Sequence, residues 1–328
     1  MSNQATQPNT ATATIEGRNS IGAFLKLFRI SNTPTIITNV FVGASVAALM
    51  EPGSFPNITN VIVVSFGLVF IYIAGMATND YFDQVVDAQE RPTRPIPSRQ
   101  ISSNTALIVG VLFLLMGMTA CAFVSIDTLP WVMLLSSSVL AYNILHLARF
   151  MGPLLMGMCR TLGLVVAAIA LSPSHSPDWP ILVFFALPLG ICTFGISLVA
   201  RNEMKRIDFA GEIIRTQKMG RIMIATALIG VGAIAPLGAI AMRLIDPMDD
   251  SMTLTYVVSL ALACFAFFRG LTFITHPRAA HIGVMHWIAA LSLMDAASLC
   301  ILNQPILAYS AIGCFILTSM LQRRITGS

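Results

Sequence analysis

Long apolar stretches recur along this chain of 328 residues, and they constrain its fold more than any other feature. A bilayer core about 30 Å thick is crossed by about 20 helical residues, and only a helix or a closed barrel satisfies every backbone donor and acceptor in lipid. The sequence therefore predicts an all-α, multi-pass membrane bundle. Ten stretches are long enough or nearly so, and we place them near residues 33–50, 58–77, 106–125, 130–148, 153–171, 180–200, 222–243, 254–274, 282–302 and 305–321.

The composition agrees with a surface that faces lipid. Hydrophobic residues make up 56% of the chain and charged residues only 10%, whereas a soluble domain carries roughly a quarter charged residues. The formal charge of +4 does not predict a nucleic-acid partner, because the basic residues are distributed between the apolar stretches and form no continuous patch. We therefore exclude nucleic-acid binding and expect contact with membrane lipids.

The basic residues predict how the chain is oriented in the membrane. If the N-terminus is cytosolic and the stretches alternate in direction, only Arg243 of the 19 basic residues falls on the side opposite the cytosol. Both ends of the chain and its two long polar segments are then cytosolic. Residues 1–20 are polar and lack the order of a signal peptide, so we expect a disordered tail there and one membrane domain over 21–328.

The first unusual chemistry lies in the polar segment after the second stretch, which reads Asn-Asp-Tyr-Phe-Asp-Gln-Val-Val-Asp from Asn79. If the second stretch continues as a helix through Asp87, then Asp80, Asp83 and Asp87 lie within an arc of roughly 60° on one helix face. Three close carboxylates at a membrane boundary repel one another and require a cation. Because Mg²⁺ binds carboxylate and phosphate oxygens together, these three acids are our candidate catalytic and metal-binding residues.

Arginines follow these acids within a segment that we expect to be extended and punctuated by prolines. Arg91, Arg94 and Arg99 carry planar donors that match phosphate oxygens, and Arg91 and Arg94 are our candidate phosphate ligands. An acidic face next to arginines is the pattern expected for a metal-bound diphosphate. The alternative is a solvated loop whose charges only set the topology, but clustered acids are costly beside lipid, which favours the functional interpretation.

A second polar segment, residues 201–221, could complete such a site. Glu203, Asp208 and Glu212 are candidate oxygen ligands for the metal, and Lys205 and Lys218 are candidate phosphate ligands. The segment also carries further basic residues, and the positive-inside rule alone would account for them. The sequence leaves both interpretations open.

The motif Asn79-Asp80-x-x-Asp83-x-x-x-Asp87, followed by Arg-Pro-x-Arg-Pro-Ile-Pro-Ser, resembles the first acidic motif of the UbiA superfamily of intramembrane prenyltransferases. The likeness extends over residues 21–321 in the order of the spans. It implies a helical bundle of nine spans, or ten as counted here, around a central cavity that opens to lipid and has a polar cytosolic cap. It also implies that the motif binds a prenyl diphosphate through Mg²⁺.

The resemblance also implies that residues outside the motif contact the substrate. Arg29 and Asn32 match a stretch of the family at the start of the first helix and are expected to line the same cavity. Tyr142 lies near the cytosolic end of the fourth span, and Arg160 lies near the cytosolic start of the fifth, where it could reach phosphate. The alternative is an anchor at the membrane interface for the two arginines and core packing for the tyrosine.

The likeness weakens at the second acidic motif. The family usually has an Asp-x-x-x-Asp pair, whereas this sequence keeps the spacing only as Asp208-x-x-x-Glu212. The stretch from Met151 to Arg160, together with Ala200-Arg201-Asn202-Glu203, is similar to a divergent branch of the superfamily that is encoded in bacterial and algal clusters for secondary metabolites.

The activity implied by the resemblance is transfer of an isoprenyl group from a prenyl diphosphate to an aromatic or other lipophilic acceptor, with Mg²⁺ assisting ionisation of the diphosphate. Aromatic faces such as Tyr81, Phe82 or Tyr142 would stabilise the allylic cation. One alternative is a protein that kept the fold, lost turnover and binds or helps to transport an isoprenoid or lipophilic metabolite. A transporter is disfavoured, because Asp295 is almost the only ionisable residue expected in the middle of a span.

Overall fold

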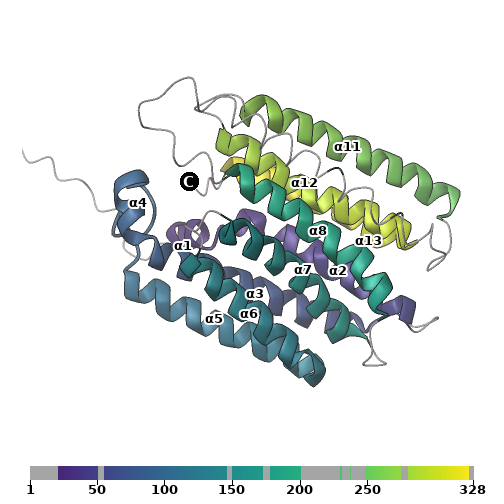
Figure 1. Ribbon diagram of the computed structural model, residues 1–328, viewed down its shortest axis with the longest axis horizontal. Helices are drawn as coiled ribbons and strands as arrows, with labels where there is room; N and C mark the ends of the chain where they lie inside the picture. Colours follow the sequence, from purple (N-terminus) through teal and green to yellow (C-terminus); the bar gives the residue numbers. More distant parts are fainter. Residues whose placement is uncertain are drawn as a thin grey trace, which may run out of the picture.

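The computed structural model describes residues 21–50, 55–145, 150–172, 178–200, 230, 237, 248–274 and 280–324. Within these residues the regular secondary structure is entirely helical (Figure 1). The elements are α1 (Ile21–Leu27), η1 (Ile30–Asn32), α2 (Pro34–Met50), α3 (Ile58–Phe82), α4 (Gln84–Glu90), α5 (Ser103–Val124), η2 (Ile126–Thr128), α6 (Leu129–Leu145), α7 (Met151–Leu171), α8 (Trp179–Ala200), α11 (Asp250–Ile274), α12 (Ala280–Ile301) and α13 (Pro305–Arg324).

Nine helices in the described part of the chain are long and apolar enough to cross a membrane. Their bounds agree with nine of the ten predicted stretches to within a few residues. The tenth, near residues 222–243, lies outside the described residues apart from two positions, and the predicted tail and the second polar segment lie wholly outside them. The prediction of an all-α membrane bundle is confirmed.

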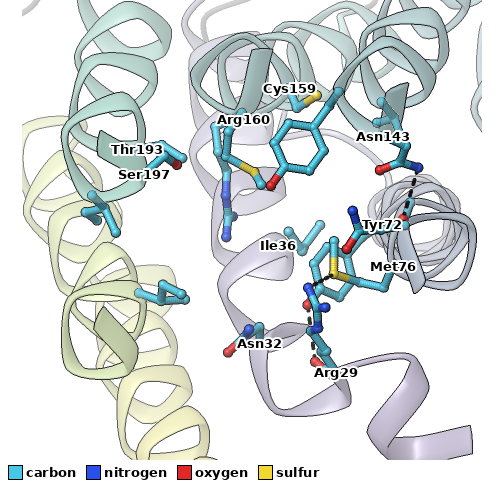
Figure 2. Close-up of a pocket in the computed structure, with 18 of the residues that line it drawn as sticks. Arg29, Asn32, Ile36, Tyr72, Met76, Asn143, Cys159, Arg160, Thr193 and Ser197 are labelled. Atoms are coloured by element: carbon cyan, nitrogen blue, oxygen red, sulfur yellow. Dashed lines mark hydrogen bonds between the residues drawn. The ribbon is translucent and has the colours of Figure 1, made fainter. Parts of the chain in front are cut away.

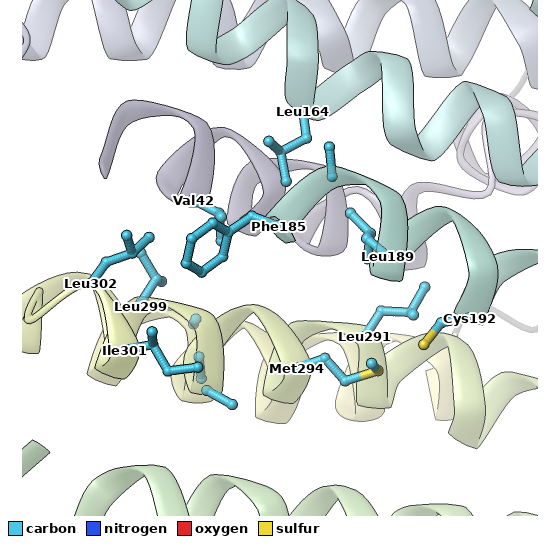
Figure 3. Close-up of a cluster of buried hydrophobic side chains, with 14 of the residues drawn as sticks. Val42, Leu164, Phe185, Leu189, Cys192, Leu291, Met294, Leu299, Ile301 and Leu302 are labelled. Atoms are coloured by element: carbon cyan, nitrogen blue, oxygen red, sulfur yellow. The ribbon is translucent and has the colours of Figure 1, made fainter. Parts of the chain in front are cut away.

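Helix α2 lies between two hydrophobic cores. Val42 packs into one core with residues of α7 and α8, including Leu164 and Phe185, and with residues of α12 (Figure 3). Val40 packs into the other core with residues of α3, α6 and α7. Because residues two apart on a helix point about 200° away from each other, α2 contributes one face to each core.

The outer helices carry large apolar side chains on their exposed surfaces. Phe123 in α5, Phe265 in α11 and Ile306 in α13 are all exposed. A soluble protein rarely exposes so much contiguous apolar surface, but lipid is a good solvent for it. These helices therefore expose apolar faces where surface helices in water expose polar ones.

Small residues bring neighbouring helices close together. A Cβ atom added at Gly117 of α5 would lie 2.5 Å from the carbonyl oxygen of Gly67 in α3. A Cβ atom added at Gly283 of α12 would lie 2.5 Å from the carbonyl oxygen of Gly270 in α11. Since lipid offers no hydrophobic driving force between helices, such close van der Waals contact is a main source of their association.

The helix that carries the acidic motif bends within it. The prediction of a continuous helix through Asp87 is wrong in detail, because α3 ends at Phe82, Asp83 lies between the two helices, and α4 begins at Gln84. The Asp83 N–H still donates to the Asn79 carbonyl, and the Asp87 N–H donates to the Asp83 carbonyl. Hydrogen bonding thus continues through the bend while α4 turns away from α3 (Figure 1).

The segment after α4 forms turns and not the extended chain that was predicted. The Ser98 N–H donates to the Arg94 carbonyl, and the Ile101 N–H donates to the Pro95 carbonyl. Ile96 and Ile101 are buried in a small core with residues of α1, α3 and α5. This core fixes α4 and the turns that follow it, which we call the polar cap, on one end of the bundle.

The two ends of the bundle differ in charge. The Gln322 amide donates to Asn32 Oδ1 at 3.0 Å, so the end of α13 lies beside η1 and the start of α2. With the spanning helices alternating in direction, every described Lys and Arg except Arg160 lies at or near this end. Acidic residues occupy the opposite end, namely Asp127, Asp178, Asp249 and Asp250.

Candidate functional site

A cavity of about 380 Å³ lies inside the bundle between α2, α3, α6, α7, α8 and α12 (Figure 2). Apolar residues such as Ile71, Leu135 and Leu291 form much of its wall. Charged and amide groups from η1, the end of α3 and the turns after α4 line it toward the polar cap, namely Arg29, Asn32, Asn79, Asp83, Arg91 and Arg94. A cavity with this lining suits an amphiphile with an apolar tail and an anionic head.

A cluster of buried charges stabilises the capped end. Asp80 Oδ1 lies 3.1 Å from Arg29 Nη2 and 3.4 Å from Arg94 Nη1. The same Arg94 Nη1 lies 2.5 Å from Asp87 Oδ2. Asp80, Asp87 and Arg94 each expose 5% or less of their surface, and such charges are tolerated at a membrane boundary only when they are paired.

Burial works to lower the pKa of both arginines of the cluster, Arg29 and Arg94, but their charged neighbours differ. Burial and the nearby Arg29 lower the pKa of Arg94 below its ordinary value, although Asp80 and Asp87 oppose this shift. Burial also works to lower the pKa of Arg29, but the neighbouring Asp80, with Tyr72, Tyr142 and Asp87, outweighs it and the pKa is raised. Both guanidinium groups stay protonated, because arginine does not lose its proton in proteins. A buried Arg94 is therefore stabilised by any additional anion.

Arg29 is positioned by an unusual backbone conformation. Its φ of 45° and ψ of 48° lie in the left-handed region, which non-glycine residues seldom adopt. The Tyr72 hydroxyl donates to the Arg29 carbonyl oxygen at 3.2 Å, and Arg29 Nη1 donates to Met76 Sδ at 3.2 Å (Figure 2). These contacts direct the guanidinium toward the cavity, and strained residues of this kind often occur at functional sites.

The structure divides the acidic motif into two pairs of residues. Asn79 and Asp83 line the cavity, whereas Asp80 and Asp87 do not line it and instead bind Arg94. The bend at Asp83 accounts for part of this difference from the predicted single face. The two pairs can therefore act differently. Asn79 and Asp83 can contact a molecule in the cavity, whereas Asp80 and Asp87 hold Arg94 at its edge.

The other predicted site residues have three different outcomes. Asn32, Arg91 and Tyr142 line the cavity. Arg160 lines it too, but the predicted position near the start of its span is wrong, because it is the tenth of the 21 residues of α7 and lies about 14 Å along the helix. The predicted residues of the second polar segment lie outside the described residues, namely Glu203, Lys205, Asp208, Glu212 and Lys218.

The aromatic residues at the cavity differ in part from those predicted. Tyr81 and Phe82 do not line the cavity and pack against each other, with ring centroids 5.4 Å apart. Tyr72 lines it instead, together with Met76. Sequence reasoning missed these two, although stepping back from Asn79 in helical steps of three or four residues leads to Met76 and then Tyr72.

Comparison with known proteins identifies the family. A sequence model of the UbiA prenyltransferase family matches residues 40–286. The chain belongs to this family. It is accordingly an integral, multi-pass membrane protein, and the acidic motif and most of the cavity lie inside the matched region of the UbiA fold.

Curated relatives match parts of the chain. A digeranylgeranylglyceryl phosphate synthase of Methanococcus maripaludis strain C6 is 32% identical over 103 residues, which are 31% of this chain and 36% of the relative. The enzyme of the same name from Methanoregula boonei is 29% identical over 164 residues, which are 50% of this chain and 56% of the relative. The chain thus spans between about a third and just over half of the length of these relatives.

Solved structures of UbiA homologues share the fold over most of the chain. The apo homologue from Aeropyrum pernix K1 gives a TM-score of 0.62 at 15% identity, covering 80% of this chain and 96% of that protein. A homologue from Archaeoglobus fulgidus, bound to DMAPP and Mg²⁺, gives a TM-score of 0.55 at 13% identity, covering 83% and 99%. At these identities the likeness establishes the fold.

The oxygen donors of the cavity fit a particular kind of magnesium site. Within the described residues, no group of three or more His, Cys, Asp or Glu side chains is placed to hold a metal ion. The predicted grouping of three carboxylates is therefore not present there. Mg²⁺ usually keeps several waters and binds one or two carboxylates together with substrate phosphates. Asn79 and Asp83, which line the cavity, supply hard oxygen atoms that fit such a site in a UbiA protein.

Proposed function

We propose that the protein is a membrane prenyltransferase that transfers an isoprenyl group from a prenyl diphosphate to an aromatic or other lipophilic acceptor. The observation that carries the proposal is a single cavity with apolar walls whose capped end presents Asp83 beside Arg29, Arg91 and Arg94. The apolar walls suit an isoprenoid tail, and the guanidinium groups suit its diphosphate. The homologue from Archaeoglobus fulgidus bound to DMAPP and Mg²⁺ supports this class of donor substrate.

The arginines of the capped end would stabilise the departing diphosphate. As the bond between the allylic carbon and the diphosphate oxygen breaks, negative charge develops on the leaving group next to Arg29, Arg91 and Arg94. Preorganised positive groups act most strongly where charge develops in a site from which water is excluded. Asp80 and Asp87 would act indirectly, by holding Arg94 at the edge of the cavity.

Asn79 and Asp83 would hold the magnesium ion together with the diphosphate. Bound there, Mg²⁺ supplies further charge neutralisation for the leaving group. Of the remaining predicted metal ligands, Glu203, Asp208 and Glu212 would complete the site from the second polar segment, and Lys205 and Lys218 would add phosphate contacts.

The aromatic and apolar walls would protect the reactive carbon until transfer. Tyr72 and Tyr142 both line the cavity, and their ring faces can stabilise the allylic cation. Apolar walls exclude the water that would otherwise quench it. The acceptor then forms a bond to the allylic carbon and loses a proton, which leaves diphosphate and the prenylated product.

We place the capped end of the bundle and both termini in the cytosol. The concentration of described Lys and Arg residues at that end supports this orientation, since the positive-inside rule assigns such an end to the cytosol. The diphosphate group of the substrate and Mg²⁺ would then reach the site from the cytosol, where both are available.

A second candidate function is a UbiA-like protein without turnover that binds or helps to transport an isoprenoid. Asp80 and Asp87 both form ion pairs with Arg94. If these ion pairs persist when substrate is bound, neither acid is available to a metal ion, and this favours the alternative. Both candidates predict binding of the prenyl diphosphate. Only the transferase predicts breakage of its carbon–oxygen bond.

The test is to incubate the protein, purified in detergent, with labelled prenyl diphosphates, Mg²⁺ and a lipid extract of the source cell. A transferase releases diphosphate and places the label in a lipophilic product, and Asp83→Asn reduces both by about a hundredfold or more, as expected for loss of an electrostatic group at the reacting end. Glu90→Gln is the matched control, because Glu90 is an exposed acid on the neighbouring short helix. Tight binding without release in the wild type would favour the alternative.

A further inference from the structure

Two charged residues lie inside spanning helices, away from the helix ends, and are not used by the steps above. Arg160 is the tenth of 21 residues in α7, and Asp295 is the sixteenth of 22 in α12. Among the described residues, no other Asp, Glu, Lys or Arg lies so near the middle of a spanning helix. Charged side chains inside a membrane are costly, face the interior of a bundle and usually serve a function.

Helix α2 joins these two residues through hydrogen bonds. Arg160 donates to the Thr35 carbonyl oxygen at 3.0 Å and to Thr35 Oγ1 at 2.7 Å, and Thr38 Oγ1 donates to Asp295 Oδ2 at 2.5 Å. With its amide oriented to match its neighbours, Asn39 donates to Asp295 Oδ2 at 2.8 Å and accepts from Arg160 Nη1 at 3.3 Å. Asp295 Oδ2 accepts both of its hydrogen bonds, as a carboxylate does, and in that form the network couples a cation and an anion and carries no net charge.

Only the cation of this pair faces the cavity. Arg160 and Asn39 line it, while Asp295 is 3% exposed and does not. On the facing helix α8, Thr193 and Ser197 lie one turn apart and also line the cavity, and Figure 2 labels them on α8 across from Arg160. A polar wall thus interrupts the apolar lining at this depth, which a purely structural hydrogen-bond network would not require.

The polar wall lies within reach of the reacting end. Tyr72 contacts the Arg29 carbonyl oxygen and is also an electrostatic neighbour of Arg160, so it lies between the two arginines. Tyr72 precedes Asp80 by eight residues, which is about 12 Å along α3. A small molecule anchored at Arg160 would therefore direct its other end toward the carbon next to the diphosphate.

We propose that Arg160, together with Asn39 and Ser197, binds the polar group of the acceptor, and that this group is neutral: a hydroxyl or carbonyl oxygen. The assignment rests on the proposed prenyl transfer. Asp295 acts as a positioning residue, since it balances the charge of Arg160 without touching the acceptor.

An anionic acceptor is disfavoured because Asp295 already balances the positive charge of Arg160. A carboxylate or phosphate on the acceptor would bring a second negative charge to a single guanidinium in a medium of low dielectric constant, where uncompensated charge is costly. A hydroxyl group avoids that cost, because it can accept from Arg160 and donate to Ser197. The positively charged residues at the capped end remain available for the diphosphate.

The test compares two probes of similar shape and different charge. We measure binding of benzyl alcohol and of benzoate to the protein in detergent by saturation-transfer NMR and equilibrium dialysis. The wild type should prefer the alcohol by about fivefold or more, in line with one hydrogen bond gained without a charge penalty. Asp295→Asn should reverse the preference toward the carboxylate, because the amide keeps an acceptor for Thr38 and removes the negative charge.

Arg160→Gln should weaken binding of the alcohol by about fivefold or more. Arg269→Gln is its matched control, as an exposed arginine on α11 that does not line the cavity. If Arg160→Gln fails to fold, Ser197→Ala should still weaken binding of the alcohol by about threefold. Preference of the wild type for the carboxylate, or an unchanged preference in Asp295→Asn, would overturn the proposal. Binding and turnover of dimethylallyl diphosphate are measured separately, so a failure there counts against prenyl transfer and not against the charge preference.

Discussion

At Arg94, one guanidinium group contacts two buried carboxylates, those of Asp80 and Asp87. Arg94→Met would leave Asp87 without this cation, and among the described residues Asp80 would keep Arg29. Removing one partner from a buried ion pair typically destabilises a protein by about 3–5 kcal/mol. We therefore expect a large fall in the melting temperature, measured by scanning fluorimetry in detergent.

Arg99→Met provides the control for this prediction, because Arg99 is exposed in the same segment of turns. Losing an exposed charge usually changes the free energy of unfolding by less than about 0.5 kcal/mol. Equal melting temperatures for the two variants would show that the buried cluster does not stabilise the cap.

Gly163 allows the volume of the cavity to be changed without disturbing the packing. It lines the cavity, and a Cβ atom added there would meet nothing within 4 Å. Gly163→Ala should leave the fold intact or stabilise α7 by about 0.5–1 kcal/mol. Gly163→Leu should fold equally well but reduce diphosphate release by about tenfold or more, since it fills space that the substrates require. Full activity of Gly163→Leu would argue that this part of the cavity is not used.

At the scale of helices, the pairing of α3 with α5 depends on the absence of side chains at Gly67 and Gly117. Gly117→Val should destabilise the bundle by about 1–3 kcal/mol or more, because the new Cβ atom would meet the Gly67 backbone. Gly313→Val on α13 is the control, since a Cβ atom added there meets nothing within 4 Å. Melting temperatures of the two variants measure the difference. A loss of the same size in both would trace the effect to helix propensity.

Sequence patterns predicted the spanning helices well because lipid imposes a length and an apolar composition on each of them. They predicted the polar cap less well. The spacing of Asp80, Asp83 and Asp87 describes positions on one helix, but a bend at Asp83 and the return of the following turns decide which side chains meet. The pairing of Arg94 with two acids depends on the burial of Ile96 and Ile101, which a linear motif does not encode.

The same holds for the cavity, where sequence patterns predicted part of the lining and tertiary packing determines the rest. Arg29, Asn32, Arg91 and Tyr142 were predicted at the site and line it. The network around Arg160 was not predicted, since it joins α2, α7 and α12 across more than a hundred residues of sequence. Only tertiary packing brings such residues together.

For the whole molecule, the unequal charge of the two ends predicts its orientation. Glu90→Cys introduces a thiol at the capped end, and Asp178→Cys introduces one at the opposite end, and both positions are exposed. In intact cells a membrane-impermeant maleimide should label Asp178→Cys, and it should label Glu90→Cys only after the membrane is opened. The reverse labelling pattern would place the capped end outside the cytosol.

The most direct test of the central claim is an experimental structure of the protein with dimethylallyl diphosphate and Mg²⁺. The account predicts diphosphate density beside Arg91, Arg94 and Asp83, with the isoprenyl group directed toward Tyr72 and the apolar wall. Diphosphate bound elsewhere, or a cavity filled only by lipid at saturating substrate, would contradict it.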